Sequence, residues 1–284
     1  MIGSIRYYED ITSKIAKESE AVVVVVGYRL SPENPFPTQW QDCLTATVHF
    51  MKHAEDYGVD PSCIVVGGDS AGGNFATVVT RELLDRPDLP KLRAQVLIYP
   101  GLQALDFNLP SYQQNASVPI LFQESVVFYG LKFLSRDGAL TSDLLKGCHV
   151  PDEFRAKYEK WLSPDNIPER FRRRGYRRCL LGRYKPEVHD QVPNLLHDTF
   201  SSLFVDDATL SRYPETFIAS CEYDVLRDDA LLYKKRLEDN GVKVSWFHAQ
   251  QGFHGIINLC YMNFVQFPDG MEILEKASGF VRDL

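Results

Sequence analysis

The sequence has no apolar stretch long enough to cross a membrane as a helix. Its longest apolar run, residues 21–27, is far shorter than the ~18 residues that a span needs. The first residues also lack the basic start, apolar centre and small-residue cleavage site of a signal peptide. As written, the chain is expected to be soluble, and any membrane association would require an anchor outside it.

The sequence is also poor in features typical of metal centres and nucleic-acid interfaces. Its six cysteines form no C-x-x-C pair and its histidines show no ligand spacing, which argues against a structural zinc site. We expect Cys43 and Cys63, which lie in apolar segments, to be buried. With 31 Lys and Arg against 38 Asp and Glu, the formal net charge is −7. No nucleic-acid partner is therefore expected.

The composition, with 44% hydrophobic and 24% charged residues, is that of a folded globular protein. Apolar residues at every third or fourth position predict helices over residues 40–51, after Ser70 and over 230–240. Runs of β-branched residues without alternation predict five strands that are covered on both faces, at residues 21–27, 63–67, 94–99, 216–220 and 243–248. Strands that alternate with helices indicate an α/β fold with a mostly parallel sheet.

Between two of these strands, residues 101–214 form an interval too long for a simple crossover. It contains a predicted helix at 119–134 and an arginine-rich run at 169–178. We interpret the interval as a helical cap or lid, inserted over the carboxyl edge of the sheet within one domain, residues 1–284. The arginines are expected to form a solvated helix face, with binding of an anionic surface or substrate as the alternative.

The most informative motif is Gly68-Asp69-Ser70-Ala71-Gly72, a G-x-S-x-G sequence between a predicted strand and a predicted helix. In this context the motif predicts a nucleophile elbow, a tight turn that holds Ser70 exposed in a strained conformation. The N–H of Ala71, at the start of the helix, would stabilise an oxyanion. A glycine-rich phosphate-binding turn is the alternative, but no P-loop lysine follows.

A serine nucleophile needs a general base and a carboxylate that orients it. Asp224 follows the fourth predicted strand and His254 follows the fifth, so both are expected at the same edge of the sheet as Ser70. Glu222, Asp228 and Asp229 compete with Asp224, although a helix N-terminus explains the last two. The remaining histidines are predicted to be surface or packing residues: His49, His53, His149, His189, His197 and His248.

These motifs resemble the hormone-sensitive-lipase branch of the alpha/beta hydrolases, and more narrowly the arylacetamide deacetylase family. The resemblance extends over essentially the whole chain and includes residues 28–33 (YRLSPE), 68–73 (GDSAGG), 224–228 (DVLRD) and 252–255 (GFHG). Residues 84–94 and 158–165 are most similar to the arylacetamide deacetylase-like 4 subfamily. The resemblance implies a hydrolase of small-molecule esters or amides, with Ser70, Asp224 and His254 as its triad and no metal or organic cofactor.

The chain also departs from this family. Members carry a His-Gly-Gly-Gly turn that supplies further oxyanion donors, and this sequence begins after it. Because loss of one such donor costs ~10²–10³ in rate, slow turnover is expected. Members have eight strands, of which the five predicted here would be the last, so we expect an N-terminally incomplete chain.

The resemblance further implies an anchor in the endoplasmic reticulum membrane with the domain on the lumenal side. The sequon Asn115-Ala-Ser117 is a glycosylation candidate compatible with that location. The sequence thus predicts a serine hydrolase of carboxylic esters, with aryl amides as a second candidate substrate class. The alternatives are a catalytically impaired ligand-binding module and a fragment that does not fold.

Overall fold

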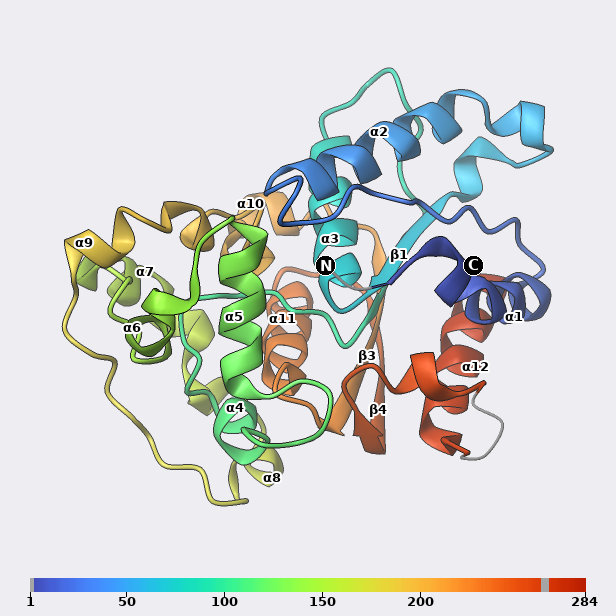
Figure 1. Cartoon of the computed structure of the whole chain (residues 1–284). Helices are drawn as coiled ribbons and strands as arrows, with labels where there is room; N and C mark the ends of the chain where they lie inside the picture. Colours follow the sequence, from blue (N-terminus) through green and yellow to red (C-terminus); the bar gives the residue numbers. More distant parts are fainter. Residues whose placement is uncertain (1–2, 262–265) are drawn as a thin grey trace.

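A computed structural model of the chain describes residues 3–261 and 266–284. Its centre is a parallel sheet of four strands in the order β1-β2-β3-β4 (Figure 1). The strands are β1 (Val65–Asp69), β2 (Ala94–Ile98), β3 (Glu215–Tyr223) and β4 (Val244–Phe253). Four of the five predicted strands are therefore confirmed, with their ends shifted by up to five residues.

The predicted strand at residues 21–27 is wrong. This segment is not part of the sheet, and β1 is an edge strand in the described part of the chain. Val22 and Val24 are 58% and 52% exposed, so the segment is not covered on both faces. Its β-branched residues favour extended backbone, but a strand also needs a neighbour that pairs with its N–H and C=O groups.

Helices cover both faces of the sheet. Leu97 and Ile218 pack into one apolar cluster with α3 and α11, whereas Val96 and Phe217 pack into another with α1 and α12. Figure 1 shows α3 and α11 on one side of the strands and α12 on the other. These layers comprise α1 (Glu9–Ser19), α2 (Thr38–Lys52), α3 (Ala71–Leu83), α11 (Arg227–Asp239) and α12 (Pro268–Arg282).

Residues 99–214, between β2 and β3, form a helical segment that we call the insertion. It lies beyond α11 and α3, away from α1 and α12 (Figure 1). Its α-helices are α4 (Pro110–Gln114), α5 (Gln123–Phe133), α6 (Thr141–Leu145), α7 (Asp152–Leu162), α8 (Glu169–Arg172), α9 (Pro186–His189) and α10 (Asp207–Leu210). The helix predicted at 119–134 is α5, which begins four residues later, after a bend at residues 119 and 120.

Short 3-10 helices occupy several connections: η1 (Ile5–Tyr8), η2 (Ala54–Tyr57), η3 (Pro61–Cys63), η4 (Gly138–Leu140), η5 (Pro164–Asn166), η6 (Pro193–Leu196), η7 (Ser202–Phe204) and η8 (Ile256–Leu259). All six cysteines are free thiols. Cys63 is exposed, and Cys43 is only partly buried, so their predicted burial is wrong. Cys63 lies in η3 ahead of the strand, and the helical turn directs its side chain outward.

Several arginines of the 169–178 run form ion pairs within the insertion or with β3. Arg173 pairs with Glu169 at 3.0 Å, and Arg172 pairs with Asp165 at 3.2 Å. Arg174 lies 3.8 Å from the carboxylate of Glu222. Among residues 3–261 and 266–284, no helix is long and apolar enough to span a bilayer.

Candidate active site

Three polar side chains lie at the carboxyl ends of three strands. Ser70 directly follows β1, Asp224 directly follows β3, and His254 directly follows β4. Because the strands are parallel, their carboxyl ends share one edge of the sheet. The sequence-predicted residues are thus brought together, although they are far apart along the chain.

The turn that carries Ser70 has the geometry expected of a nucleophile elbow. Ser70 has φ 56° and ψ −120°, a conformation that non-glycine residues rarely adopt. A Cβ on Gly68 would lie 2.4 Å from the backbone of Gly72, so the close crossing of strand and helix requires glycine. The Ser70 N–H donates to the carbonyl of Ile98 at 2.9 Å, which ties the turn to β2.

A continuous hydrogen-bonded chain joins the three side chains. Ser70 Oγ lies 2.8 Å from His254 Nε2, and His254 Nδ1 lies 2.8 Å from Asp224 Oδ2. A carboxylate only accepts, so Nδ1 carries the proton and Nε2 is free to accept one from the serine hydroxyl. Asp224 is fully buried and His254 is 7% exposed. The imidazole is thus held in the orientation and tautomer that general-base catalysis requires.

Ala71 begins α3, where the first N–H groups of a helix have no intrahelical acceptor. Its N–H therefore lies beside Ser70 at the positive end of the helix dipole. This is the position from which one backbone donor could stabilise negative charge on a bound carbonyl oxygen.

Asp69, between β1 and Ser70, is enclosed by two tyrosines. Tyr8 and Tyr99 donate to Asp69 Oδ2 at 3.2 and 3.3 Å. Burial raises the pKa of Asp69, and the two hydrogen bonds oppose that rise. The Tyr99 ring also lies 4.9 Å from the His254 ring. The sequence did not indicate either tyrosine, since their contacts depend on the tertiary fold.

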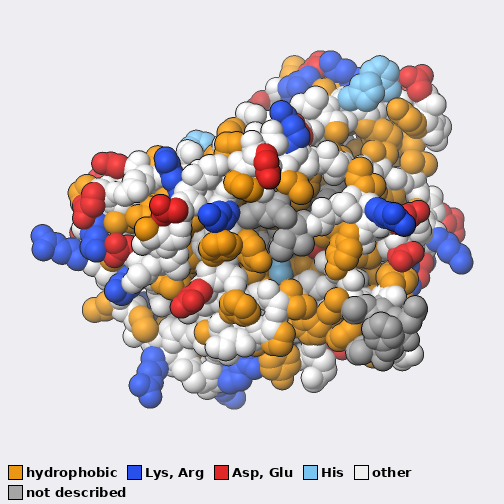
Figure 2. Space-filling view, in the orientation of Figure 1, with side chains coloured by type: hydrophobic (Ala, Val, Ile, Leu, Met, Phe, Trp, Pro, Cys, Tyr) orange, Lys and Arg blue, Asp and Glu red, His pale blue; other side chains and the backbone are white. Residues whose placement is uncertain are grey.

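Ser70 and His254 line a cavity of about 1030 Å³. The cavity continues between residues 21–27 and β1, and its insertion side is apolar. Lining residues there include Phe107, Leu121, Val126, Leu144, Leu195 and Phe200. On the molecular surface, hydrophobic side chains gather over α5 and between α5 and α12 (Figure 2).

The competing acidic residues have other partners. Glu222 pairs with Arg227 and with His248, both at 3.2 Å. Asp228 accepts a hydrogen bond from the Ser111 N–H at 2.6 Å, and Asp229 accepts one from the Leu102 N–H at 2.9 Å. Both aspartates lie in the first turn of α11, as predicted, but they also bind the insertion.

The competing histidines make their contacts with residues other than Ser70. His49, on α2, and His53, directly after α2, have ring centres 4.4 Å apart, and His248 bonds Glu222 and Ser220. His149 is buried against the carbonyl of Ala104. His189 and His197 bond partners within the insertion.

The glycosylation prediction for Asn115 is contradicted by the structure. Asn115 is fully buried, and its Nδ2, the atom that would carry a glycan, donates to the carbonyls of Glu222 and Asp224 at 3.0 and 2.9 Å. The folded chain has no room for a sugar on this nitrogen. A three-residue sequon reports neither burial nor hydrogen bonding.

The fold and this geometry define the chain as an alpha/beta hydrolase. A family model described as alpha/beta hydrolase fold matches residues 1–147 and 176–258. Solved structures with this architecture include carboxyl esterase 2 of Tuber melanosporum (TM-score 0.73, 21% identity, covering 100% of this chain and 73% of that one). Another is the carboxylesterase EstE1 from a metagenomic library (TM-score 0.72, 26% identity, covering 99% and 75%).

The chain belongs to the arylacetamide deacetylase-like family. It is 46% identical to human arylacetamide deacetylase-like 3 and 42% identical to human arylacetamide deacetylase-like 4, each over 100% of this chain and 70% of the relative. Bovine arylacetamide deacetylase is 39% identical over 90% of this chain and 65% of its own length. The segments at 84–94 and 158–165 suggested arylacetamide deacetylase-like 4. Over the whole chain, however, the identity to arylacetamide deacetylase-like 3 is higher.

Proposed function

We propose that this chain hydrolyses carboxylic esters through an acyl-enzyme formed on Ser70. The two 2.8 Å contacts that join Ser70, His254 and Asp224 support this proposal most directly. The esterase and deacetylase names of the related proteins agree with it.

In the first half of the reaction, His254 Nε2 accepts the hydroxyl proton while Ser70 Oγ attacks the ester carbonyl carbon. Asp224 stabilises the imidazolium, and the Ala71 N–H stabilises the oxyanion of the tetrahedral intermediate. His254 then gives its proton to the departing alkoxide, and the carbon–oxygen bond breaks. In the second half, His254 deprotonates a water that attacks the acyl carbon, which releases the acid and restores Ser70.

The insertion is proposed to act as a cap that selects the substrate. Its apolar side chains line the cavity above Ser70, and such a surface favours esters with an apolar acyl or aryl group. Hydrolysis of aryl amides and a lumenal location in the endoplasmic reticulum remain predictions from the family resemblance.

The test is rapid mixing with p-nitrophenyl acetate. The wild-type chain should release a burst of nitrophenol approaching one equivalent per chain, and Ser70→Ala should abolish the burst. Ser211→Ala, which alters an exposed serine, should keep it. A chain that unfolds cooperatively but gives no burst and no labelling by a fluorophosphonate would contradict hydrolysis and favour a ligand-binding module.

A further inference from the structure

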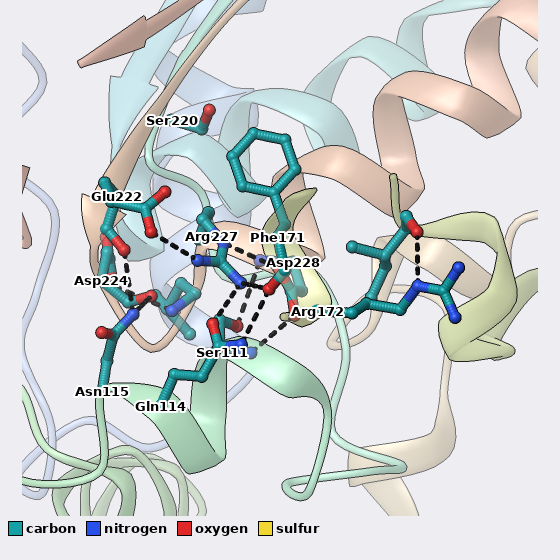
Figure 3. A network of polar contacts seen from close by, with 12 residues as sticks. Ser111, Gln114, Asn115, Phe171, Arg172, Ser220, Glu222, Asp224, Arg227 and Asp228 are labelled. Atoms are coloured by element: carbon teal, nitrogen blue, oxygen red, sulfur yellow. Dashed lines mark hydrogen bonds and ion pairs between the residues drawn. The ribbon is translucent and has the colours of Figure 1, made fainter. Parts of the chain in front are cut away.

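The end of β3 is irregular where the strand leads into Asp224. Cys221 pairs with Ala249 and Tyr223 pairs with Phe253, so β4 carries two extra residues opposite the end of β3. Such a bulge leaves backbone groups without ladder partners. The carbonyls of Glu222 and Asp224, on either side of Tyr223, both accept a hydrogen bond from Asn115 Nδ2, at 3.0 and 2.9 Å. One buried amide of the insertion thus holds the backbone on both sides of Tyr223, opposite the bulge (Figure 3).

The orientation of this amide is fixed from its other side. Asn115 Oδ1 accepts a hydrogen bond from Arg174 Nη2 at 2.6 Å, which requires Nδ2 to face the two carbonyls. The guanidinium of Arg174 also lies 5.1 Å from the centre of the Tyr223 ring and 3.8 Å from the carboxylate of Glu222. Arg174 therefore contacts both the amide and the end of β3 that the amide holds.

We propose that Asn115 is a positioning residue for Asp224, which makes the insertion part of the catalytic machinery; this inference rests on the proposed hydrolytic function. Asp224 Oδ1 is held by the N–H of Leu226 at 2.8 Å, and Asp224 Oδ2 faces His254. Asn115 fixes the backbone carbonyl of the same aspartate. Without this hydrogen bond the aspartate can move away from the imidazole, and a misplacement of ~1 Å costs about 10²-fold in rate.

The first test compares Asn115→Ala with Asn166→Ala. Asn166 is a matched control, because its Nδ2 also bridges two backbone carbonyls of the insertion, those of Lys160 and Trp161, at 2.8 and 3.2 Å. Asn115→Ala should lower kcat about 10²-fold with little change in KM, whereas Asn166→Ala should keep the wild-type kcat. A folded Asn115→Ala with wild-type kcat, or an equal loss in both variants, would overturn the proposal.

A second pair of variants decides the question if Asn115→Ala does not fold. Arg174→Ala removes the hydrogen bond that orients the amide, and Arg173→Ala removes a neighbouring arginine whose partner is the exposed Glu169. Arg174→Ala should lower kcat about tenfold, the rate equivalent of one charged hydrogen bond. Arg173→Ala should keep the wild-type kcat. Equal kcat values in this pair would contradict the proposal.

A spectroscopic readout separates this inference from the proposed function. The Nδ1 proton shared by His254 and Asp224 should give a far-downfield proton resonance that weakens or moves upfield in Asn115→Ala and Arg174→Ala. A wild-type chain that gives no burst but shows this dependence would refute hydrolysis and keep the positioning role. Absence of the resonance from the wild type, or an unchanged resonance in both variants, would refute the positioning role.

Discussion

At the scale of single residues, a strained backbone conformation presents the hydroxyl of Ser70. The φ and ψ of Ser70 cost about 1–3 kcal/mol relative to a relaxed conformation. The hydrogen bond from its N–H to Ile98 helps to offset this cost. In return, Ser70 Oγ reaches His254 and lies at the first turn of α3, where the free N–H groups are.

His149 makes stability sensitive to acid. It is fully buried, its Nε2 lies 2.7 Å from the carbonyl of Ala104, and its Nδ1 has no hydrogen-bond partner among the described residues. Burial lowers the pKa of His149 from 6.5 to about 4. Because the unfolded chain binds this proton more readily, the histidine stabilises the fold fully above pH 6.5, and that stabilisation is lost as the pH falls towards 4.

We expect His149→Gln to reduce this acid sensitivity, since the glutamine amide can donate to Ala104 but cannot become charged. The wild type should lose up to ~3 kcal/mol more in free energy of unfolding between pH 7 and pH 4 than the variant does. Urea denaturation at both pH values measures the difference. Equal losses in the two proteins would show that His149 does not titrate in this range.

The sequence was sufficient to place Ser70, Asp224 and His254, because each follows a strand and the chain order is that of the alpha/beta hydrolases. Asn115 could not be interpreted in this way. Its partners, Glu222 and Asp224, are more than 100 residues away, so its buried amide is evident only once the insertion is packed on β3.

At the scale of secondary-structure elements, the close contact between β1 and α3 depends on Gly68 more than on Gly72. A Cβ on Gly68 would clash with the Gly72 backbone, whereas a Cβ on Gly72 would meet nothing within 4 Å. Gly68→Ala should therefore lower the free energy of unfolding by about 1–3 kcal/mol. Gly72→Ala should leave it unchanged or raise it by up to ~1 kcal/mol. Thermal melts of both variants test this, and a similar loss in each would contradict it.

The two valine-rich segments show why local pattern predicts strands only in part. Residues 21–27 and residues 64–66, which lead into β1, are both runs of mostly β-branched side chains, yet only β1 has a paired neighbour, β2. Backbone preference is local and can be inferred from composition, whereas pairing depends on which segment lies alongside. The number of strands in the sheet therefore could not be derived from the sequence pattern.

At the scale of the whole molecule, one buried arginine connects the sheet edge to the insertion. Arg227, in the first turn of α11, is 1% exposed. It donates to Asp228 Oδ1 at 2.9 Å, to Gln114 Oε1 at 2.9 Å and to the Phe171 carbonyl at 2.9 Å. Figure 3 shows its guanidinium at the centre of these partners, which come from α4, α8 and α11.

Removal of this side chain should weaken the fold far more than removal of an exposed arginine. Arg227→Ala leaves Asp228 buried without its counter-charge, so the free energy of unfolding should fall by about 3–5 kcal/mol. Arg29→Ala is the control, because Arg29 pairs with Asp42 through a side chain that is 62% exposed, and it should cost less than ~1 kcal/mol. Denaturant unfolding measures both losses. Arg227→Ala should also speed proteolysis at residues 169–178, since α8 loses its tie to α11. Equal stability losses in the two variants and unchanged cleavage would show that Arg227 does not hold the insertion in place.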